Sequence, residues 1–87
     1  METDYAQVPY TDWTIEHVAQ WLESTVWLPQ YKEKFAELAI DGGLLQFIED
    51  QDLINDAGIN IWLHRVKILE SIKKLSIQFS ASAIELA

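Results

Sequence analysis

The groups best suited to chemistry in this sequence are charges of opposite sign in two separate stretches of the chain. The acidic stretch spans positions 41–56, contains no basic residue and carries five carboxylates: Asp41, Glu49, Asp50, Asp52 and Asp56. The next stretch places two cations behind an aromatic residue: Asn60, Trp62, Leu63, Arg65 and Lys67. Clustered carboxylates can hold a metal ion or act in acid–base catalysis, and separated charges can pair with a partner.

The spacing of these residues does not fit a metal site. Asp50, Asp52 and Asp56 lack the ligand at the fifth position, the glycine at the sixth and the terminal glutamate of a calcium loop. A zinc site is not expected, because the chain has no cysteine and its two histidines, His17 and His64, lie far apart in sequence. For any single acid, the simpler interpretation is a solvated position or a favourable charge at a helix N-terminus.

The sequence also lacks recognisable combinations of catalytic residues. The sequence offers no Ser-His-Asp arrangement, phosphate-binding loop or paired-carboxylate cleft. We therefore predict that the chain is not an enzyme, has no catalytic residue and uses no cofactor, metal or small molecule.

Length and composition predict one small packed domain. The chain has 87 residues, of which 49% are hydrophobic, and four are tryptophans, so most large apolar side chains are expected in one core. The net charge of −8 disfavours nucleic acid, because phosphate binding depends on clustered lysine and arginine. No apolar run is long enough for a membrane helix, and the first residues do not resemble a signal peptide. We expect a soluble, intracellular piece of a larger protein, cytoplasmic with the nucleus left open, and without membrane contact.

Helical periodicity predicts four short helices and one long one to position these groups: residues 15–22, 29–38, 44–48, 49–57 and 61–75 or beyond. Thr14 and Asn60 are predicted N-caps, and Gly58 is predicted to end the fourth helix in the left-handed conformation. Residues 24–27 are expected to form a short link. We expect a flexible tail over residues 1–11, a domain over 12–76, and a helix extension or frayed end over 77–87.

The longest helix carries apolar residues on more than one side. One face is expected in the core: Ile61, Ile68, Ile72, Leu75 and Phe79. Large apolar and aromatic residues from earlier in the chain are expected to pack with it: Trp13, Trp21, Tyr31, Phe35 and Leu45. Trp62, Val66 and Ile77 fall well off that face. Trp62 could fold back as the rim of the core or stand exposed as an interface anchor, and we favour the anchor.

Several short motifs follow one another in a characteristic order. They are Trp13-Thr14-Ile15-Glu16-His17-Val18-Ala19-Gln20-Trp21-Leu22, Leu28-Pro29-Gln30-Tyr31 with Phe35, Ile40-Asp41-Gly42 with Leu44-Leu45, Asp52-Leu53, Gly58-Ile59, and His64-Arg65 with Lys67-Ile68-Leu69. In this order and spacing they resemble the sterile alpha motif (SAM) domain, an all-α bundle of five helices, over residues 12–76. Two departures stand out: Leu63 replaces the usual glycine before His64, and the link before Leu28 is one residue longer and contains Trp27.

The resemblance implies a protein–protein interaction module. The acids match the mid-loop surface of the family, through which Asp50, Asp52 and their neighbours would accept a partner's cations, and the start of the last helix matches the end-helix surface. The implied partner is another SAM domain, itself or related, bound head to tail in an oligomer or polymer that scaffolds or regulates a larger protein. The implied contact residues are Asp41, Glu49, Asp50, Asp52, Asp56, Asn60, Trp62, Leu63, Arg65 and Lys67. The simpler interpretation leaves Arg65 bordering the core face and Lys67 solvated.

Three other hypotheses remain open. Leu63 could disable self-association and leave a domain that binds only a different SAM domain. Some SAM domains bind RNA hairpins near the last helix, where this chain offers Arg65, Lys67, Lys73 and Lys74, although Glu70 and the net charge oppose it. The domain could also be a regulatory segment of an enzyme that lies outside this chain.

Overall fold

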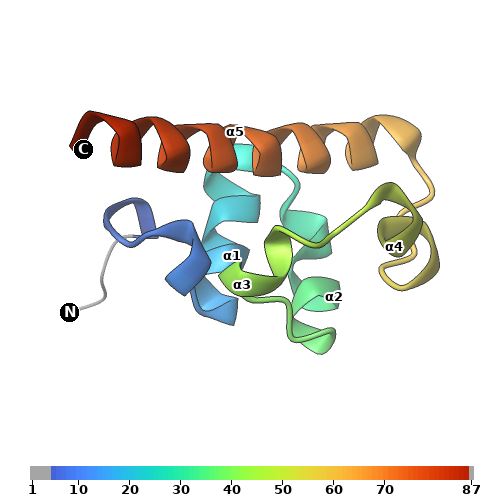
Figure 1. Ribbon diagram of the computed structural model, residues 1–87. Coiled ribbons are helices and arrows are strands. Elements are labelled where there is room, and N and C mark those ends of the chain that lie inside the picture. Colours follow the sequence, from blue (N-terminus) through green and yellow to red (C-terminus); the bar gives the residue numbers. More distant parts are fainter. Residues whose placement is uncertain (1–4, 87) are drawn as a thin grey trace.

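The computed structural model describes residues 5–86, and for Ala6 and residues 79–86 it describes the course of the backbone only. The predicted all-α fold is confirmed, because the described residues contain no strand and form five α-helices: α1 (Ile15–Trp21), α2 (Lys32–Glu37), α3 (Gly42–Leu45), α4 (Asp50–Asn55) and α5 (Trp62–Leu86). Figure 1 shows α5 lying along one side of the bundle, with the other helices packed beneath it. The first turn, Tyr5–Gln7, and the end of α5 lie at one end of the molecule, opposite α4 and the start of α5.

The segment before α1 lies against the bundle. It forms two 3₁₀ turns, η1 (Tyr5–Gln7) and η2 (Tyr10–Asp12). Trp13 Nε1 donates to the backbone oxygens of Tyr5, at 2.8 Å, and Val8, at 2.9 Å. The Tyr5 hydroxyl lies 2.6 Å from Thr25 Oγ1. Residues 5–11 of the expected tail are therefore held by the indole of Trp13, while residues 1–4 lie outside the described range.

The start of α1 follows from local chemistry. Thr14 Oγ1 accepts from the backbone N–H of His17 at 3.2 Å, as expected of an N-cap. The backbone N–H of Thr14 donates in return to His17 Nδ1 at 3.1 Å. His17 thus takes the place that glutamate or glutamine usually has in a capping box, and both backbone donors are satisfied.

Residues 24–26 of the link expected at residues 24–27 are helical in the structure. Leu22–Val26 continues α1 as a π-helical turn, η3, which ends at Trp27 with a φ of 66°. The wider turn places both Leu22 and Val26 in the core, and this burial outweighs the low helix propensity of the β-branched residues. A 3₁₀ turn, η4 (Pro29–Tyr31), then leads into α2, so Pro29 begins the second helical segment as predicted.

The third helix begins earlier than predicted. It starts at Gly42 because Asp41 Oδ1 accepts from the backbone N–H of Leu44 at 3.1 Å and caps it. Gly42 also lies against the second 3₁₀ turn, where a Cβ would come within 1.7 Å of Tyr10 O. Only glycine allows this approach. α3 is thereby held beside Trp13.

The connection from α4 to α5 is partly as predicted. Gly58 has a φ of 66°, and the backbone N–H of Ile59 donates to Leu53 O at 2.9 Å, which closes the end of α4. The prediction of Asn60 as N-cap is wrong: the backbone N–H groups of His64 and Arg65 both donate to Ile61 O, at 3.0 and 3.2 Å, so Ile61 takes that position.

The core contains most of the residues expected in it. Trp13, Trp21, Phe35, Leu45, Ile68 and Ile72 are buried, and Tyr31 and Leu75 are half-buried against them. Ile61 is 53% exposed, because it precedes α5 and therefore does not share the helix face of Ile68. The side chain of Phe79 lies outside those described.

Candidate protein-interaction surfaces

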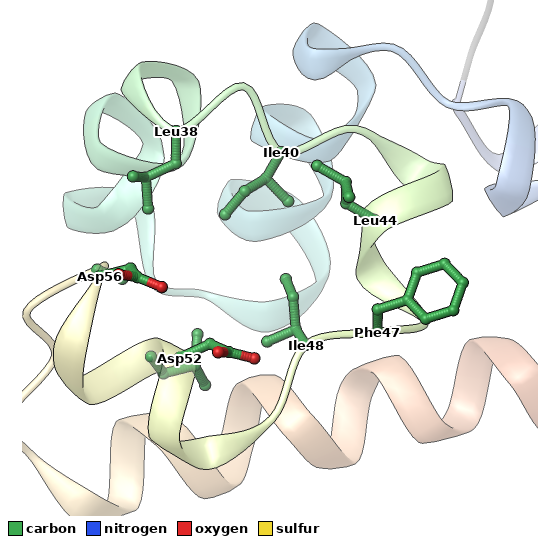
Figure 2. Close-up of a pocket in the computed structure, with 9 residues that line it drawn as sticks. Leu38, Ile40, Leu44, Phe47, Ile48, Asp52 and Asp56 are labelled. Atoms are coloured by element: carbon green, nitrogen blue, oxygen red, sulfur yellow. The ribbon is translucent and has the colours of Figure 1, made fainter.

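An apolar groove opens between the end of α2, α3 and α4. It has a volume of about 310 Å³ and is lined by Leu38, Ile40, Leu44, Phe47, Ile48, Asp52, Leu53, Asp56 and Ala57. Figure 2 shows Asp52 and Asp56 along its α4 side, with Leu38 and Ile40 opposite them. We call this site the groove.

The walls of the groove expose large apolar side chains. Phe47 is 69% exposed and Leu44 is also exposed. A concave apolar surface with a few polar groups at its edge is typical of a binding site. The groove was not predicted from the sequence, although the run from Leu44 to Ile48 contains more apolar residues than one helical turn can bury on one side.

The five predicted acids have different surroundings. Asp52 and Asp56 are exposed and line the groove, so the structure brings these two together at one site. Asp41 caps α3. Glu49 precedes α4 and is exposed, and its backbone N–H donates to Asp52 Oδ2 at 2.9 Å. Asp50 is engaged within the chain, as described next.

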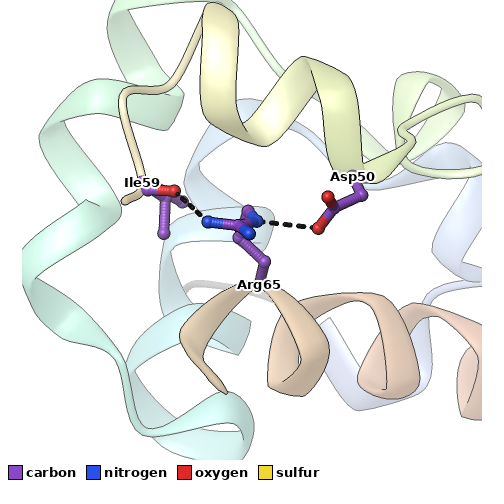
Figure 3. A network of polar contacts seen from close by, with 3 residues as sticks. All are labelled: Asp50, Ile59 and Arg65. Carbon is purple, nitrogen blue, oxygen red and sulfur yellow. Dashed lines mark hydrogen bonds and ion pairs between the residues drawn. The ribbon is translucent and has the colours of Figure 1, made fainter. Parts of the chain in front are cut away.

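Arg65 is buried and satisfied inside the molecule. Its Nε donates to Asp50 Oδ1 at 2.7 Å and its Nη1 to Ile59 O at 2.9 Å, as Figure 3 shows. The residue is 9% exposed, because position 65 lies on the same face of α5 as Ile68 and Ile72. A buried guanidinium needs such partners.

This geometry corrects one sequence-based expectation. Arg65 was expected on the partner-facing surface, but its donors point at Asp50 and Ile59 of its own chain. The Asp50 carboxylate is likewise engaged by this ion pair, with 47% of its side chain exposed. The Arg65 guanidinium is therefore satisfied within its own chain, and one carboxylate oxygen of Asp50 is engaged by it.

The start of α5 carries an exposed apolar patch. Trp62 is 62% exposed and Leu63 is 66% exposed, directly after the exposed Ile61. The interpretation of Trp62 as the rim of the core is therefore wrong. Asn60 and Lys67 are also exposed near this patch. We call Ile61, Trp62 and Leu63 the apolar patch.

The position of the apolar patch is fixed from two sides. The Tyr31 hydroxyl lies 2.5 Å from His64 Nδ1, and the two rings meet edge to face with centroids 5.5 Å apart. This contact ties the first turn of α5 to η4, while Arg65 ties the second turn to α4. The patch is thus presented by a braced helix end rather than by a loop.

Other kinds of site find little support in the part of the chain that is described. There, no three histidine, aspartate or glutamate side chains gather as a metal site requires. Within the same range, no helix has the length and hydropathy needed to cross a bilayer.

Fold and surfaces together define a small helical protein-interaction domain. The family model described as SAM domain (Sterile alpha motif) matches residues 11–76, and the chain belongs to this family. SAM domains are protein-interaction modules.

Proteins with similar sequences are much longer than this chain. The chain is 33% identical over 79 residues to NAD(+) hydrolase tir-1 of Caenorhabditis elegans, a match that covers 91% of this chain and 8% of that protein. It is 41% identical over 63 residues to SH3 and multiple ankyrin repeat domains protein 2 of Homo sapiens, covering 72% and 3%. It is 33% identical over 76 residues to Liprin-beta-1 of Mus musculus, covering 87% and 7%. The chain thus spans less than a tenth of the length of each relative. The NAD(+) hydrolase activity named for tir-1 is therefore not assigned to this chain.

Proposed function

We propose that this SAM domain associates head to tail with another SAM domain, a second copy or a relative, and so links larger proteins. The observation that carries the proposal is the pair of different, complementary surfaces on one molecule: the acid-rimmed groove and the apolar patch. Two different patches form a heterologous contact, which leaves one of each free on a dimer and favours open chains.

The proposed contact places Trp62 of one copy in the groove of the next. An indole gains most from burial in an apolar site that also offers an acceptor to its N–H. Leu38, Ile40 and Leu44 supply apolar walls, and the exposed carboxylates of Asp52 and Asp56 supply acceptors. The same carboxylates would attract Lys67, which lies little more than one turn beyond Trp62.

Charge has a smaller part in this contact than the sequence suggested. Since Arg65 and Asp50 pair with each other, the complementary charges reduce to Lys67 on one side and the groove acids on the other. We therefore propose an apolar contact oriented by a few rim charges, which set the encounter rate more than the affinity.

A second candidate is association with a different SAM domain only. It is favoured by Leu63, which is exposed where the family usually has glycine and adds bulk beside Trp62. RNA hairpin binding loses support, because the buried Arg65 is withdrawn from the cations that could contact phosphate. The intracellular location expected from the sequence stays a prediction.

Sedimentation velocity across protein concentration tests the head-to-tail proposal. We expect the wild type to form open chains, and Trp62→Ala and Phe47→Asp each to sediment as species no larger than a dimer, since each removes one of the two head-to-tail surfaces. An equimolar mixture of the two variants should sediment faster than either variant alone, because one intact groove and one intact patch remain.

The matched control is Trp27→Asn. Trp27 is 72% exposed but lies on neither surface, and asparagine tolerates its left-handed backbone. This variant should assemble like the wild type. A mixture of Trp62→Ala and Phe47→Asp that sediments no faster than either variant alone, while the wild type assembles, would contradict the proposed pairing. A wild type that stays monomeric at high concentration would contradict self-association and leave a different SAM domain as the partner to test.

A further inference from the structure

A second surface lies along the outer side of α5. Val66, Glu70, Lys73 and Ile77 are spaced by four, three and four residues, the spacing at which one helix packs along another. They fall within about 60° of the helix circumference, roughly opposite the buried face that carries Ile68 and Ile72. Figure 1 shows no other element on this side of α5. We call these four residues the outer stripe.

The outer stripe is accessible and its charges are unpaired. Ile77 is 57% exposed, Glu70 and Lys73 are exposed, and Val66 is half-buried. Among the described residues, neither Glu70 nor Lys73 takes part in an ion pair. An isoleucine and two unpaired charges therefore share one solvent-facing line that neither the core nor the two docking surfaces use.

The order of residues in the outer stripe is self-complementary. Along the chain it reads apolar, acidic, basic, apolar. When a second copy of α5 runs in the opposite direction, Val66 meets Ile77 of the second copy, and Glu70 meets its Lys73. Each pairing then occurs twice across a two-fold axis, as an isologous contact requires. A parallel arrangement would instead place like charges together.

We propose that α5 pairs with α5 of a second copy in this antiparallel, two-fold contact. None of its four residues lines the groove or belongs to the apolar patch, although Val66 lies one helical turn beyond Trp62 and so borders that patch. The α5 contact forms a closed dimer, whereas the head-to-tail contact leaves one unused surface at each end of an assembly. Molecules that make both contacts would join neighbouring head-to-tail rows side by side.

Charge-reversal variants test this proposal in a protein whose head-to-tail contact is disabled. Phe47→Asp serves as background, since it disables the groove and leaves α5 unchanged. In sedimentation velocity we expect this variant to show a monomer–dimer equilibrium. Adding Glu70→Lys, or adding Lys73→Glu, turns two attractive pairs into repulsive ones and should weaken dimerisation about tenfold.

Two combinations should restore the dimer. An equimolar mixture of the Glu70→Lys and Lys73→Glu proteins places unlike charges opposite each other in the mixed dimer. The double variant Glu70→Lys/Lys73→Glu does the same within one species. The matched control is Lys67→Glu, which makes the same charge change on α5 outside the outer stripe and should leave dimerisation within about twofold.

The outcomes separate this proposal from the head-to-tail proposal. A Phe47→Asp protein that stays monomeric at high concentration would overturn the α5 contact, whatever the wild type does. Equal weakening by Lys67→Glu, or no recovery in the mixture, would also overturn it. Recovery in both combinations would support it even if the wild type formed no open chains.

Discussion

Nε of Arg65 lies 2.7 Å from Oδ1 of Asp50, so the second turn of α5 is bonded to the first residue of α4. Because Nη1 of the same side chain donates to Ile59 O, one guanidinium holds both helices and their connection. The groove acids lie on α4 and the apolar patch at the start of α5, so this residue fixes the relative position of the two surfaces.

Replacing Arg65 should therefore destabilise the domain. Arg65→Met removes both hydrogen bonds and leaves Ile59 O without a partner, which we expect to cost about 2–3 kcal/mol of unfolding free energy. The loss of unfolding free energy is not expected to be larger, because the Asp50 carboxylate is partly exposed and can be hydrated once its partner is removed. Urea denaturation followed by circular dichroism measures it. Lys67→Met, an exposed cation two residues away, should change stability by less than about 0.5 kcal/mol, and an equal loss there would refute a specific role for Arg65.

The left-handed residue at the end of α2 should be a site of stabilisation. Ala39 has a φ of 54°, and the backbone N–H groups of Ala39 and Ile40 close the helix by bonding Ala36 O and Phe35 O. Glycine adopts this conformation without strain, so Ala39→Gly should add about 0.5–1 kcal/mol of stability. Ala36→Gly, inside the same helix, should instead remove about 1 kcal/mol. Thermal unfolding of the two variants should move the midpoint in opposite directions.

Leu63 should strengthen the head-to-tail contact. It is exposed beside Trp62, so its burial by a partner would add apolar area. We expect Leu63→Ala to weaken association about fivefold, the loss of roughly 1 kcal/mol of apolar burial. Isothermal titration of the Phe47→Asp protein, which keeps its patch, into the Trp62→Ala protein, which keeps its groove, provides the reference affinity. Placing Leu63→Ala in the first protein gives the comparison. A higher affinity would mean that Leu63 obstructs the contact.

Salt should affect the head-to-tail contact only moderately. The rim charges of Lys67, Asp52 and Asp56 are exposed and screened, whereas the burial of Trp62 is not. Raising salt from roughly 0.05 M to roughly 0.5 M should weaken the same titration no more than about fivefold, mostly through slower association. A loss of binding comparable with that of Trp62→Ala would show that charges rather than the indole hold the contact.

Features set by neighbouring residues could be predicted from the sequence. The Thr14 cap and the left-handed Gly58 depend on groups a few residues apart, and both are present as expected. Helical spacing likewise identified the buried face of α5 at Ile68 and Ile72. The anchor interpretation of Trp62 was favoured over the rim of the core because position 62 falls off that face, and its 62% exposure agrees with that preference.

Features set by distant residues could not be predicted in the same way. The groove is built from α2, α3 and α4 together, and no local pattern describes it. The π-helical turn at Leu22–Val26 forms because the side chains at its two ends are both buried in the core. This burial outweighs the low helix propensity of the residues between them. The error over Arg65 was avoidable, since a charge in line with Ile68 and Ile72 indicates a buried partner, which proved to be Asp50.

The two ends of the described chain have a consequence for any longer protein that contains it. The turn η1 and the end of α5 lie at one pole, and the start of α5 lies at the other (Figure 1). Whatever precedes or follows the domain is therefore tethered away from the indole. In a row of such domains, each attached part would leave its domain at the end remote from the contact made by Trp62.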